Sequence, residues 1–320
     1  MRHAGQIAFA AAFAALSLAA LPATAGTVYP LELDNCGFAV SIPAAPKRVV
    51  TIKSTATEML VALGLADRII GVGFQDGPLP PQMAATVGGL PVLSDKLPGP
   101  EVVLATEPDF IYGGWESNFA GDGAGERPVL AGLGIASYVS PAACRTPGYV
   151  PENLQFADVF AQITEMGAIF DVAERAAALV AAQQAELDAI VPDSRGLTAL
   201  WYSSGTKTPY VGGGGGAPDM MLEALGLENI MGETPESWLS ASWEAIVDAD
   251  PDVIVLVDAM WNPVAQKKQL LSENPITSQL DAVRNERYLI IPFPASEAGV
   301  RNVAATADMA AQLAALDFSE

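Results

Sequence analysis

One segment of this chain occurs twice, and this repeat constrains the fold more than any other feature of the sequence. Residues 99–112 (GPEVVLATEPDFIY) begin with a proline that favours a helix start, and they pass through a Glu-Pro-Asp turn into an apolar strand. Residues 242–256 repeat this order, with Glu244 at the position of Glu101. A second pair of similar segments, residues 59–65 and 221–227, precedes the two copies. The repeat predicts two similar lobes, although a helix, a turn and a buried strand recur in any α/β protein.

The beginning of the chain predicts export. Arg2 is followed by an apolar run over residues 7–21 and by Ala23-Thr24-Ala25, the small-residue pattern of a cleavage site. We therefore expect residues 1–25 to be a cleavable signal peptide and the mature protein to be periplasmic. The alternative is an uncleaved membrane anchor, but the apolar run is short for a bilayer span.

The charge of the mature chain excludes several classes of function. The formal net charge of the whole chain is -21. Removal of the signal, which carries Arg2 and no acid, makes it -22. So acidic a surface disfavours binding to nucleic acid or to anionic lipid. The only histidine, His3, leaves with the signal, which weakens mechanisms that need a histidine base or a His-rich metal site.

The mature chain keeps two cysteines, Cys36 and Cys144. An even number in an oxidising compartment suggests one disulfide bond, whereas the alternative is two unrelated thiols.

Strand and helix patterns alternate along most of the chain. Residues 48–52 form a nearly continuous apolar run, typical of a buried parallel strand, and a capping box at residues 55–58 starts the next helix. A helical pattern over residues 172–190 is the longest in the mature chain and lies between the two copies of the repeat. We therefore predict an α/β fold with two Rossmann-like lobes (residues 26–170 and 193–320), each with a central parallel sheet, joined by one long rigid helix within residues 171–192.

The loops that follow the predicted strands contain the candidate ligand-binding residues, because ligands of open α/β sheets meet the carboxyl ends of the strands. Aromatic rings in these loops offer flat apolar area, and Lys53 and Arg301 could face an anionic group. Taken singly, each residue could equally be a packed surface aromatic or part of a local ion pair. The predicted ligand-binding residues are Lys53, Ser54, Phe74, Gln75, Trp115, Glu116, Tyr202, Ser203, Trp261, Phe293 and Arg301.

An enzyme is the competing hypothesis. An exported α/β oxidoreductase could use the glycine run at residues 212–216 to bind a nucleotide. The run lacks the Lys-Ser/Thr of a P-loop, and we find no nucleophile elbow and no spacing typical of metal ligands in the mature sequence. We therefore expect a protein that is not an enzyme and that has no metal site and no cofactor.

The mature chain resembles the periplasmic binding proteins of iron-siderophore and cobalamin ABC importers. The resemblance rests on residues 48–50 with the helix that follows them, on residues 62–73, on the two Glu-containing repeats and on the long middle helix. It implies two α/β lobes, a small-molecule ligand between them, and an ABC permease and ATPase as partners. It also implies that one acid on each lobe docks onto the permease, and Glu101 and Glu244 match those positions. A protein of this type that senses its ligand, rather than transporting it, would have the same sequence features.

Several loops resemble one branch of this family in particular. They are residues 93–96, 113–119, 201–205 and 292–302. That branch is proposed to import the phospholactyl precursor of the 5-deazaflavin coenzyme. We therefore expect a monomer that binds a ring-bearing, anionic ligand, with a deazaflavin precursor, a ferric siderophore and a corrinoid as the candidates.

Overall fold

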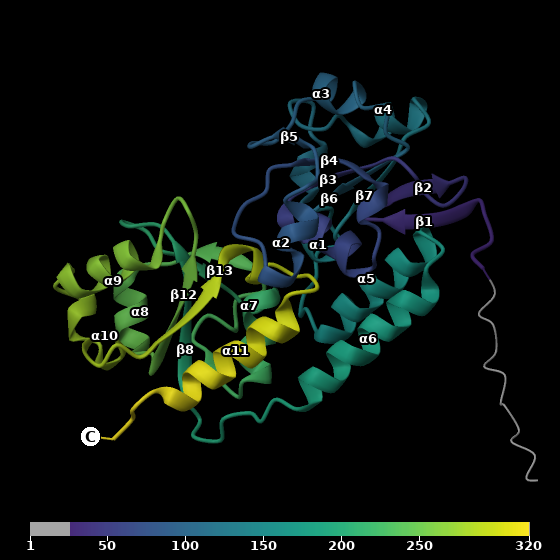
Figure 1. Ribbon diagram of the computed structural model, residues 1–320. Helices are drawn as coiled ribbons and strands as arrows, with labels where there is room; N and C mark the ends of the chain where they lie inside the picture. The colour runs from purple at the N-terminus through teal and green to yellow at the C-terminus, as the bar shows by residue number, and fades with distance from the viewer. Residues whose placement is uncertain (1–25, 320) are drawn as a thin grey trace, which may run out of the picture.

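The computed structural model describes residues 26–319, so the predicted signal peptide lies outside the described residues. The first of two large sheets has five parallel strands in the order β5-β4-β3-β6-β7 (Figure 1). Its strands are β3 (Val49–Ile52), β4 (Ile69–Gly73), β5 (Val92–Ser94), β6 (Phe110–Gly113) and β7 (Ala136–Val139). Its helices are α1 (Ser54–Ala62), α2 (Pro81–Val87), α3 (Pro100–Leu104) and α4 (Arg127–Gly132). This half has the doubly wound arrangement that the sequence predicts.

The second sheet is mixed, and here the prediction of a parallel sheet needs correction. Its order is β11-β9-β8-β12-β13, and β10 pairs in parallel with the first two residues of β8. Strand β9 runs antiparallel to β8, because only a short turn connects them and a parallel pair would need a long crossover. The strands are β8 (Thr198–Ser204), β9 (Tyr210–Gly212), β10 (Glu228–Asn229), β11 (Trp238–Ser240), β12 (Val253–Asp258) and β13 (Tyr288–Pro292). The helices are α7 (Ala217–Ala224), α8 (Trp243–Ala249), α9 (Val264–Glu273), α10 (Asp281–Arg284) and α11 (Asn302–Ala315).

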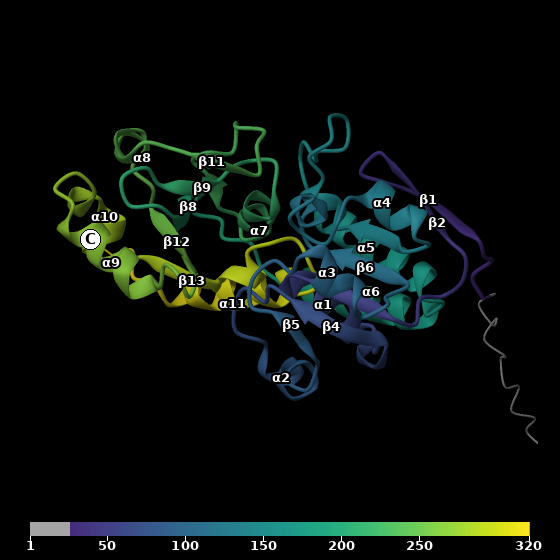
Figure 2. The ribbon, with the colours of Figure 1, turned by 90° about the horizontal axis from the view of Figure 1, so that it is seen from above.

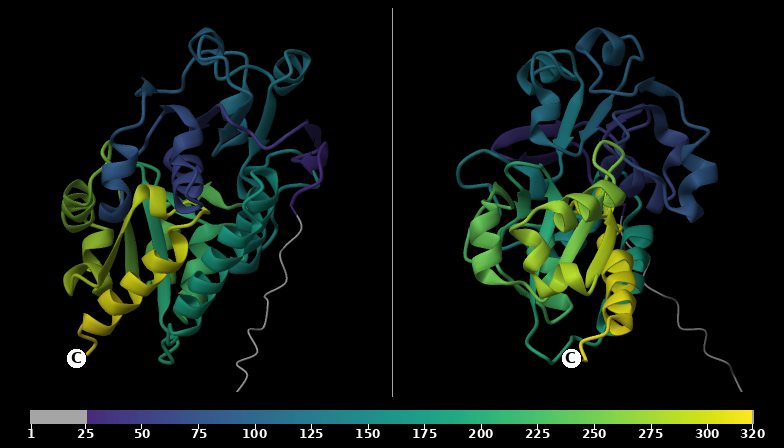
Figure 3. Two further views of the ribbon diagram at one scale, coloured as in Figure 1. Left: turned by 45° about the vertical axis from the view of Figure 1, so that its right-hand side comes forward. Right: turned by 90° about the vertical axis from the view of Figure 1, so that its left-hand side faces the viewer.

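Helix α6 (Ala173–Asp188) follows α5 (Phe156–Ile169) and leads to the second sheet. It packs along α5 on one side and against α11 on the other, so it borders both halves of the molecule (Figures 1 and 3). The side chain of Gln183 in α6 donates a hydrogen bond to the carbonyl of Val300, 2.8 Å away. Figure 2 shows the two sheets side by side, and one apolar core includes Phe110 from the first and Trp201 from the second. Helix α6 is therefore packed on both halves rather than being a free tether.

The repeat has the same local structure in both halves. Glu107 and Asp250, which precede the two prolines, both have positive φ values, 50° and 43°. The aspartate after each proline then holds the start of the neighbouring strand. Asp109 accepts hydrogen bonds from the backbone N–H groups before β3, and Asp252 accepts them from Thr198 at the start of β8. The repeated sequence thus encodes the same strand-anchoring turn twice.

A hairpin of β1 (Leu31–Asn35) and β2 (Phe38–Ile42) covers the outer side of the first sheet. Cys36 in its turn forms a disulfide bond with Cys144, with their Cα atoms 5.3 Å apart. The buried guanidinium of Arg127 donates hydrogen bonds to Asn35 and to Ser137 of β7. The hairpin is therefore fixed covalently and by polar contacts to the end of the first half.

Five short 3-10 helices complete the described chain. They are η1 (Ala66–Arg68), η2 (Glu116–Phe119), η3 (Pro141–Ala143), η4 (Thr277–Gln279) and η5 (Phe293–Ala295). Within residues 26–319, no helix is both long and apolar enough to cross a bilayer.

Candidate functional site

A cavity of about 160 Å³ lies between the two halves of the molecule. Loops after β6 and β7 form one wall, and residues around α7, β11 and η5 form the other. Parallel strands present their carboxyl ends at one edge of a sheet, so both halves meet the cavity with the loops expected to bind ligand. The lining residues that matter below are Thr55, Trp115, Arg145, Glu236, Trp238 and Glu297.

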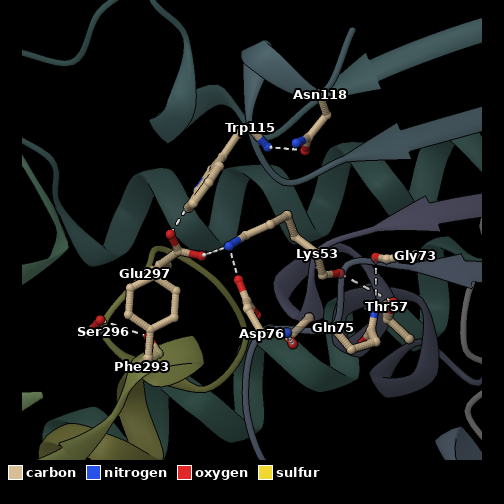
Figure 4. A network of polar contacts seen from close by, with 11 residues as sticks. Lys53, Thr57, Gly73, Gln75, Asp76, Trp115, Asn118, Phe293, Ser296 and Glu297 are labelled. Atoms are coloured by element: carbon tan, nitrogen blue, oxygen red, sulfur yellow. Dashed lines mark hydrogen bonds and ion pairs between the residues drawn. The ribbon is translucent and has the colours of Figure 1, made fainter. Parts of the chain in front are cut away.

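A buried lysine joins the two halves beside this cavity. Lys53 follows β3 and is fully buried, with its ammonium paired to Asp76 from the loop after β4. The same ammonium lies 3.6 Å from the carboxylate of Glu297, which belongs to the second half (Figure 4). Glu297 in turn accepts a 2.7 Å hydrogen bond from the indole N–H of Trp115. Trp115 and Glu297 are therefore shared between the cavity and this ionic cluster.

Aromatic rings surround the Lys53 ammonium. Its Nζ lies 3.4 Å from the ring centroid of Trp115, 4.9 Å from that of Phe74 and 5.0 Å from that of Phe293. Such cation–π contacts stabilise a cation most when it is desolvated. Gly114 makes room for this packing, because a Cβ there would lie 2.7 Å from the Lys53 Cβ.

Burial changes the ionisation of this cluster. It lowers the pKa of Lys53 to about 8, against the opposing effect of Glu297, so the ammonium is mostly protonated at neutral pH. Burial also raises the pKa of Glu297, although the neighbouring Lys53 charge opposes the rise. Burial thus disfavours the charged form of both groups, and their mutual attraction opposes that effect.

A second ion pair connects the halves at Arg301. Its guanidinium lies 3.3 Å from the carboxylate of Glu58, which is buried in α1, and it donates a hydrogen bond to the carbonyl of Pro78. Burial raises the pKa of Glu58 to about 7, and Arg301 opposes this rise. Both basic residues that the sequence offers as partners of an anionic ligand are therefore already paired with acids of this chain.

The other predicted ligand-binding residues differ in what they contact. Trp115 lines the cavity, whereas Phe74 and Phe293 pack around Lys53. Ser54 and Gln75 are engaged internally: the Ser54 hydroxyl accepts a hydrogen bond from the backbone of Asp76, and the Gln75 amide donates to Thr57 and to the Gly73 carbonyl.

Three predicted residues lie away from the cavity. Tyr202 and Ser203 are buried in β8, where the Tyr202 ring packs on Trp243 and its hydroxyl donates to the Gly205 carbonyl. Trp261 is 55% exposed and meets Phe293 edge to face, with ring centroids 4.7 Å apart. Its loop is held by buried Lys267, whose ammonium donates to the carbonyls of Val257 and Asn262.

Glu116 positions a loop rather than facing the cavity. Its carboxylate accepts hydrogen bonds from the backbone N–H groups of Arg145 and Thr146 and from the Thr146 hydroxyl.

Sequence reasoning missed several residues of the site. Trp238 and Arg145 line the cavity. Trp238 follows no predicted strand, and Arg145 lies in the loop after β7 but beyond the short helix η3, farther from the strand end than the residues that were predicted. Asp76 was missed although it comes directly after Gln75, and an acid within reach of a strand-end lysine was the available signal. Trp238 could not be assigned from spacing, because β11 joins the sheet by an antiparallel contact from a distant loop.

The glycine run is used for packing between two backbone segments. The N–H groups of Gly213, Gly214 and Gly215 donate to carbonyls of residues 234–237. A Cβ at Gly214 would lie 1.9 Å from the Gly232 carbonyl oxygen, closer than any real contact. These amides are already hydrogen-bonded and cannot cradle a phosphate, which removes the structural basis for the nucleotide-binding alternative.

Glu101 and Glu244 occupy equivalent places in the two halves. Each lies in the first turn of its helix, α3 or α8, and each side chain is exposed. Within the described chain, neither carboxylate has a hydrogen-bond or ion-pair partner. Both acids are thus available to a partner protein.

Across residues 26–319, no group of three or more His, Cys, Asp or Glu side chains is arranged to hold a metal ion. The cavity is lined by indole rings, hydroxyls and single charged groups.

The sequence matches one family model and several known binding proteins. A family model described as periplasmic binding protein matches residues 49–295. An uncharacterized ABC transporter substrate-binding lipoprotein of Bacillus subtilis is 23% identical over 302 residues, which are 92% of this chain and 88% of that protein. A cobalamin-binding protein of Halobacterium salinarum is 26% identical over 229 residues, 70% of this chain and 57% of its own length.

Solved structures share the fold. A periplasmic binding protein from Veillonella parvula superposes with a TM-score of 0.79 at 24% identity, over 88% of this chain and 97% of that chain. An ABC-type Fe3+-hydroxamate transport system protein from Saccharomonospora viridis gives a TM-score of 0.77 at 26% identity, over 90% of this chain and all of its own. The two-half architecture described above is therefore that of periplasmic binding proteins.

Proposed function

This chain belongs to the periplasmic binding protein family, and from that premise we propose that it is the solute-binding component of an ABC importer. In the periplasm it captures a ring-bearing, anionic molecule in the cavity between its two halves, and it delivers this molecule to a permease in the membrane. The observation that carries the proposal is the cavity itself, which both halves line and which contains one tryptophan from each, Trp115 and Trp238.

Indole rings support a ring-bearing ligand because they offer large, rigid apolar surfaces that stack on other flat rings. Trp238 is held for this role by stacking on Tyr210, with ring centroids 6.0 Å apart and planes 14° apart. Trp115 is fixed by its hydrogen bond to Glu297. Rings that are already ordered lose little conformational entropy when a ligand packs against them.

The size of the cavity discriminates between the candidate ligands. Typical clefts for drug-sized molecules measure about 300–1,000 Å³, and the cavity here measures about 160 Å³. A cavity of this size favours a small molecule with one ring system, such as a deazaflavin precursor. A ferric siderophore or a corrinoid, the classes suggested by the hydroxamate and cobalamin relatives, requires the two halves to separate.

Delivery to a permease is supported by the paired acids. Glu101 and Glu244 present one unpartnered carboxylate on each half, at matching helix starts. A permease with two basic patches would bind both acids at once only when the two halves hold them at the matching separation.

Replacing Trp238 by alanine tests ring capture. We expect the substitution to weaken the natural ligand by about 1–3 kcal/mol, the range for losing the burial of a large apolar side chain. Calorimetry with the molecule recovered from the native protein measures this change. Trp261→Ala is the matched control, because Trp261 is exposed and does not line the cavity. Equal affinities of both variants and the wild type would place the ligand elsewhere.

A further inference from the structure

The charges expected to bind an anion are not free to do so. Lys53 is paired with Asp76 and Glu297, and Arg301 is paired with Glu58. These two cations and three carboxylates form clusters with no excess positive charge. An anionic group entering the cavity needs another cation.

Arg145 is the cation that the structure leaves available. It is exposed and lines the cavity, and its guanidinium has no hydrogen bond or ion pair with the rest of residues 26–319. Its charge acts across the gap on the Tyr210 phenol of the second half, where it opposes the rise in pKa that burial causes. Tyr210 stacks on Trp238. The guanidinium therefore lies near the aromatic wall of the opposite half.

The backbone that presents Arg145 is held from two sides. Its neighbour Cys144 is in the disulfide bond to Cys36. Its own N–H donates to Glu116, whose carboxylate also accepts two hydrogen bonds from Thr146. The Glu116 carboxylate is thus engaged with the loop backbone and does not form an ion pair with the guanidinium. An anchored loop with an unpaired guanidinium is arranged to bind a ligand with little reorganisation.

The second half contributes an acid to the lining of the cavity. Glu236 lines the cavity from the loop before β11 and forms no ion pair with Arg145. A carboxylate repels an anionic group and accepts hydrogen bonds from a donor. The first half therefore contributes a positive charge to the cavity and the second half a negative one.

We propose that Arg145 binds the carboxylate or phosphate group of the ligand, while Trp115 and Trp238 contact its ring and Glu236 keeps further negative charge away. The assignment rests on the proposed function as a binding protein. Arg145 is then the group that selects anionic ring-bearing ligands over neutral ones of the same shape.

Two isosteric probes test this assignment. 2-Naphthoate and 2-naphthamide share a flat ring system and differ in one negative charge. Quenching of tryptophan fluorescence reports their binding, since two tryptophans line the cavity. We expect the wild type to bind naphthoate at least about tenfold more tightly, because hydrogen bonds to charged groups contribute more than neutral ones. Arg145→Gln should abolish the preference, Arg145→Lys should keep part of it, and Glu236→Gln should increase it.

Lys47→Gln is the matched control, since it removes one exposed, unpaired positive charge from the same half at the opposite edge of the sheet. It should leave the preference unchanged. Equal affinities of the wild type for both probes, or an unchanged preference in Arg145→Gln, would overturn the Arg145 assignment while leaving ring capture intact. Failure of the wild type to bind either probe at millimolar concentration would instead overturn ring capture, and with it the proposed function.

Discussion

Lys53→Met is expected to lower the free energy of unfolding by about 3–5 kcal/mol, the cost of removing one partner from a buried ion pair. The methionine would fill most of the volume but leave the carboxylates of Asp76 and Glu297 buried without a cation. It would also remove the charge that Trp115 and Phe74 surround. Urea unfolding of the ligand-free protein measures the change as a lower transition midpoint.

Two further variants distinguish charge from packing. Lys47→Met removes an exposed, unpaired lysine and should change the free energy of unfolding by less than about 0.5 kcal/mol. Adding Asp76→Asn and Glu297→Gln to Lys53→Met should recover much of the lost stability, because the two buried carboxylates that have lost their cation are then replaced by neutral amides of similar shape. If the triple variant is less stable than Lys53→Met, the loss comes from packing and the ionic account is wrong.

The double variant Glu101→Lys/Glu244→Lys is expected to abolish stimulation of the importer's ATPase and to leave ligand affinity unchanged. Each acid lies exposed in a first helical turn and outside the cavity lining. A lysine there faces the positive end of the helix dipole, which costs only about 0.3–1 kcal/mol per site. ATPase activity in proteoliposomes containing the cognate transporter, together with ligand calorimetry, measures both effects.

Glu107→Lys/Asp250→Lys provides the matched control, because these acids lie just beyond the opposite ends of the same two helices. The charge change is identical, so retained stimulation in this variant would show that position matters rather than net charge. Normal stimulation by the Glu101/Glu244 variant would mean that these acids serve only as helix-start residues.

The sequence predicted most of the fold because the repeat and the apolar strands carry strong local signals. Residues 49–52 and 253–257 form buried strands, and residues 288–291 form a strand in which Ile290 is exposed. A short strand at residues 210–211 was predicted and corresponds to β9, but its antiparallel pairing and the strand β11 were not predicted. The three-residue strands β9 and β11 are too short to show a period, and their pairing depends on the turn that follows β8.

The candidate site was harder to predict because strand-end position does not reveal what a side chain contacts. Lys53 and Arg301 follow the expected rule, yet both are paired with acids. Tyr202 lies in the core because side chains of a central strand that is covered on both faces are buried on both faces. Arg145 lies in the loop after β7 but beyond η3, so its distance from the strand end hid it, whereas Trp238 reaches the cavity only through the approach of the two halves, a long-range property with no local sequence pattern.

The most direct test of the central claim is native mass spectrometry of the protein purified from the periplasm of its own organism. We expect one bound organic molecule per chain that contains a ring system and a carboxylate or phosphate group, and that is released on denaturation. The Trp238→Ala protein, purified in the same way, should carry less of it. A wild-type protein that carries only bare metal ions, or a bound molecule without a ring, would contradict the account.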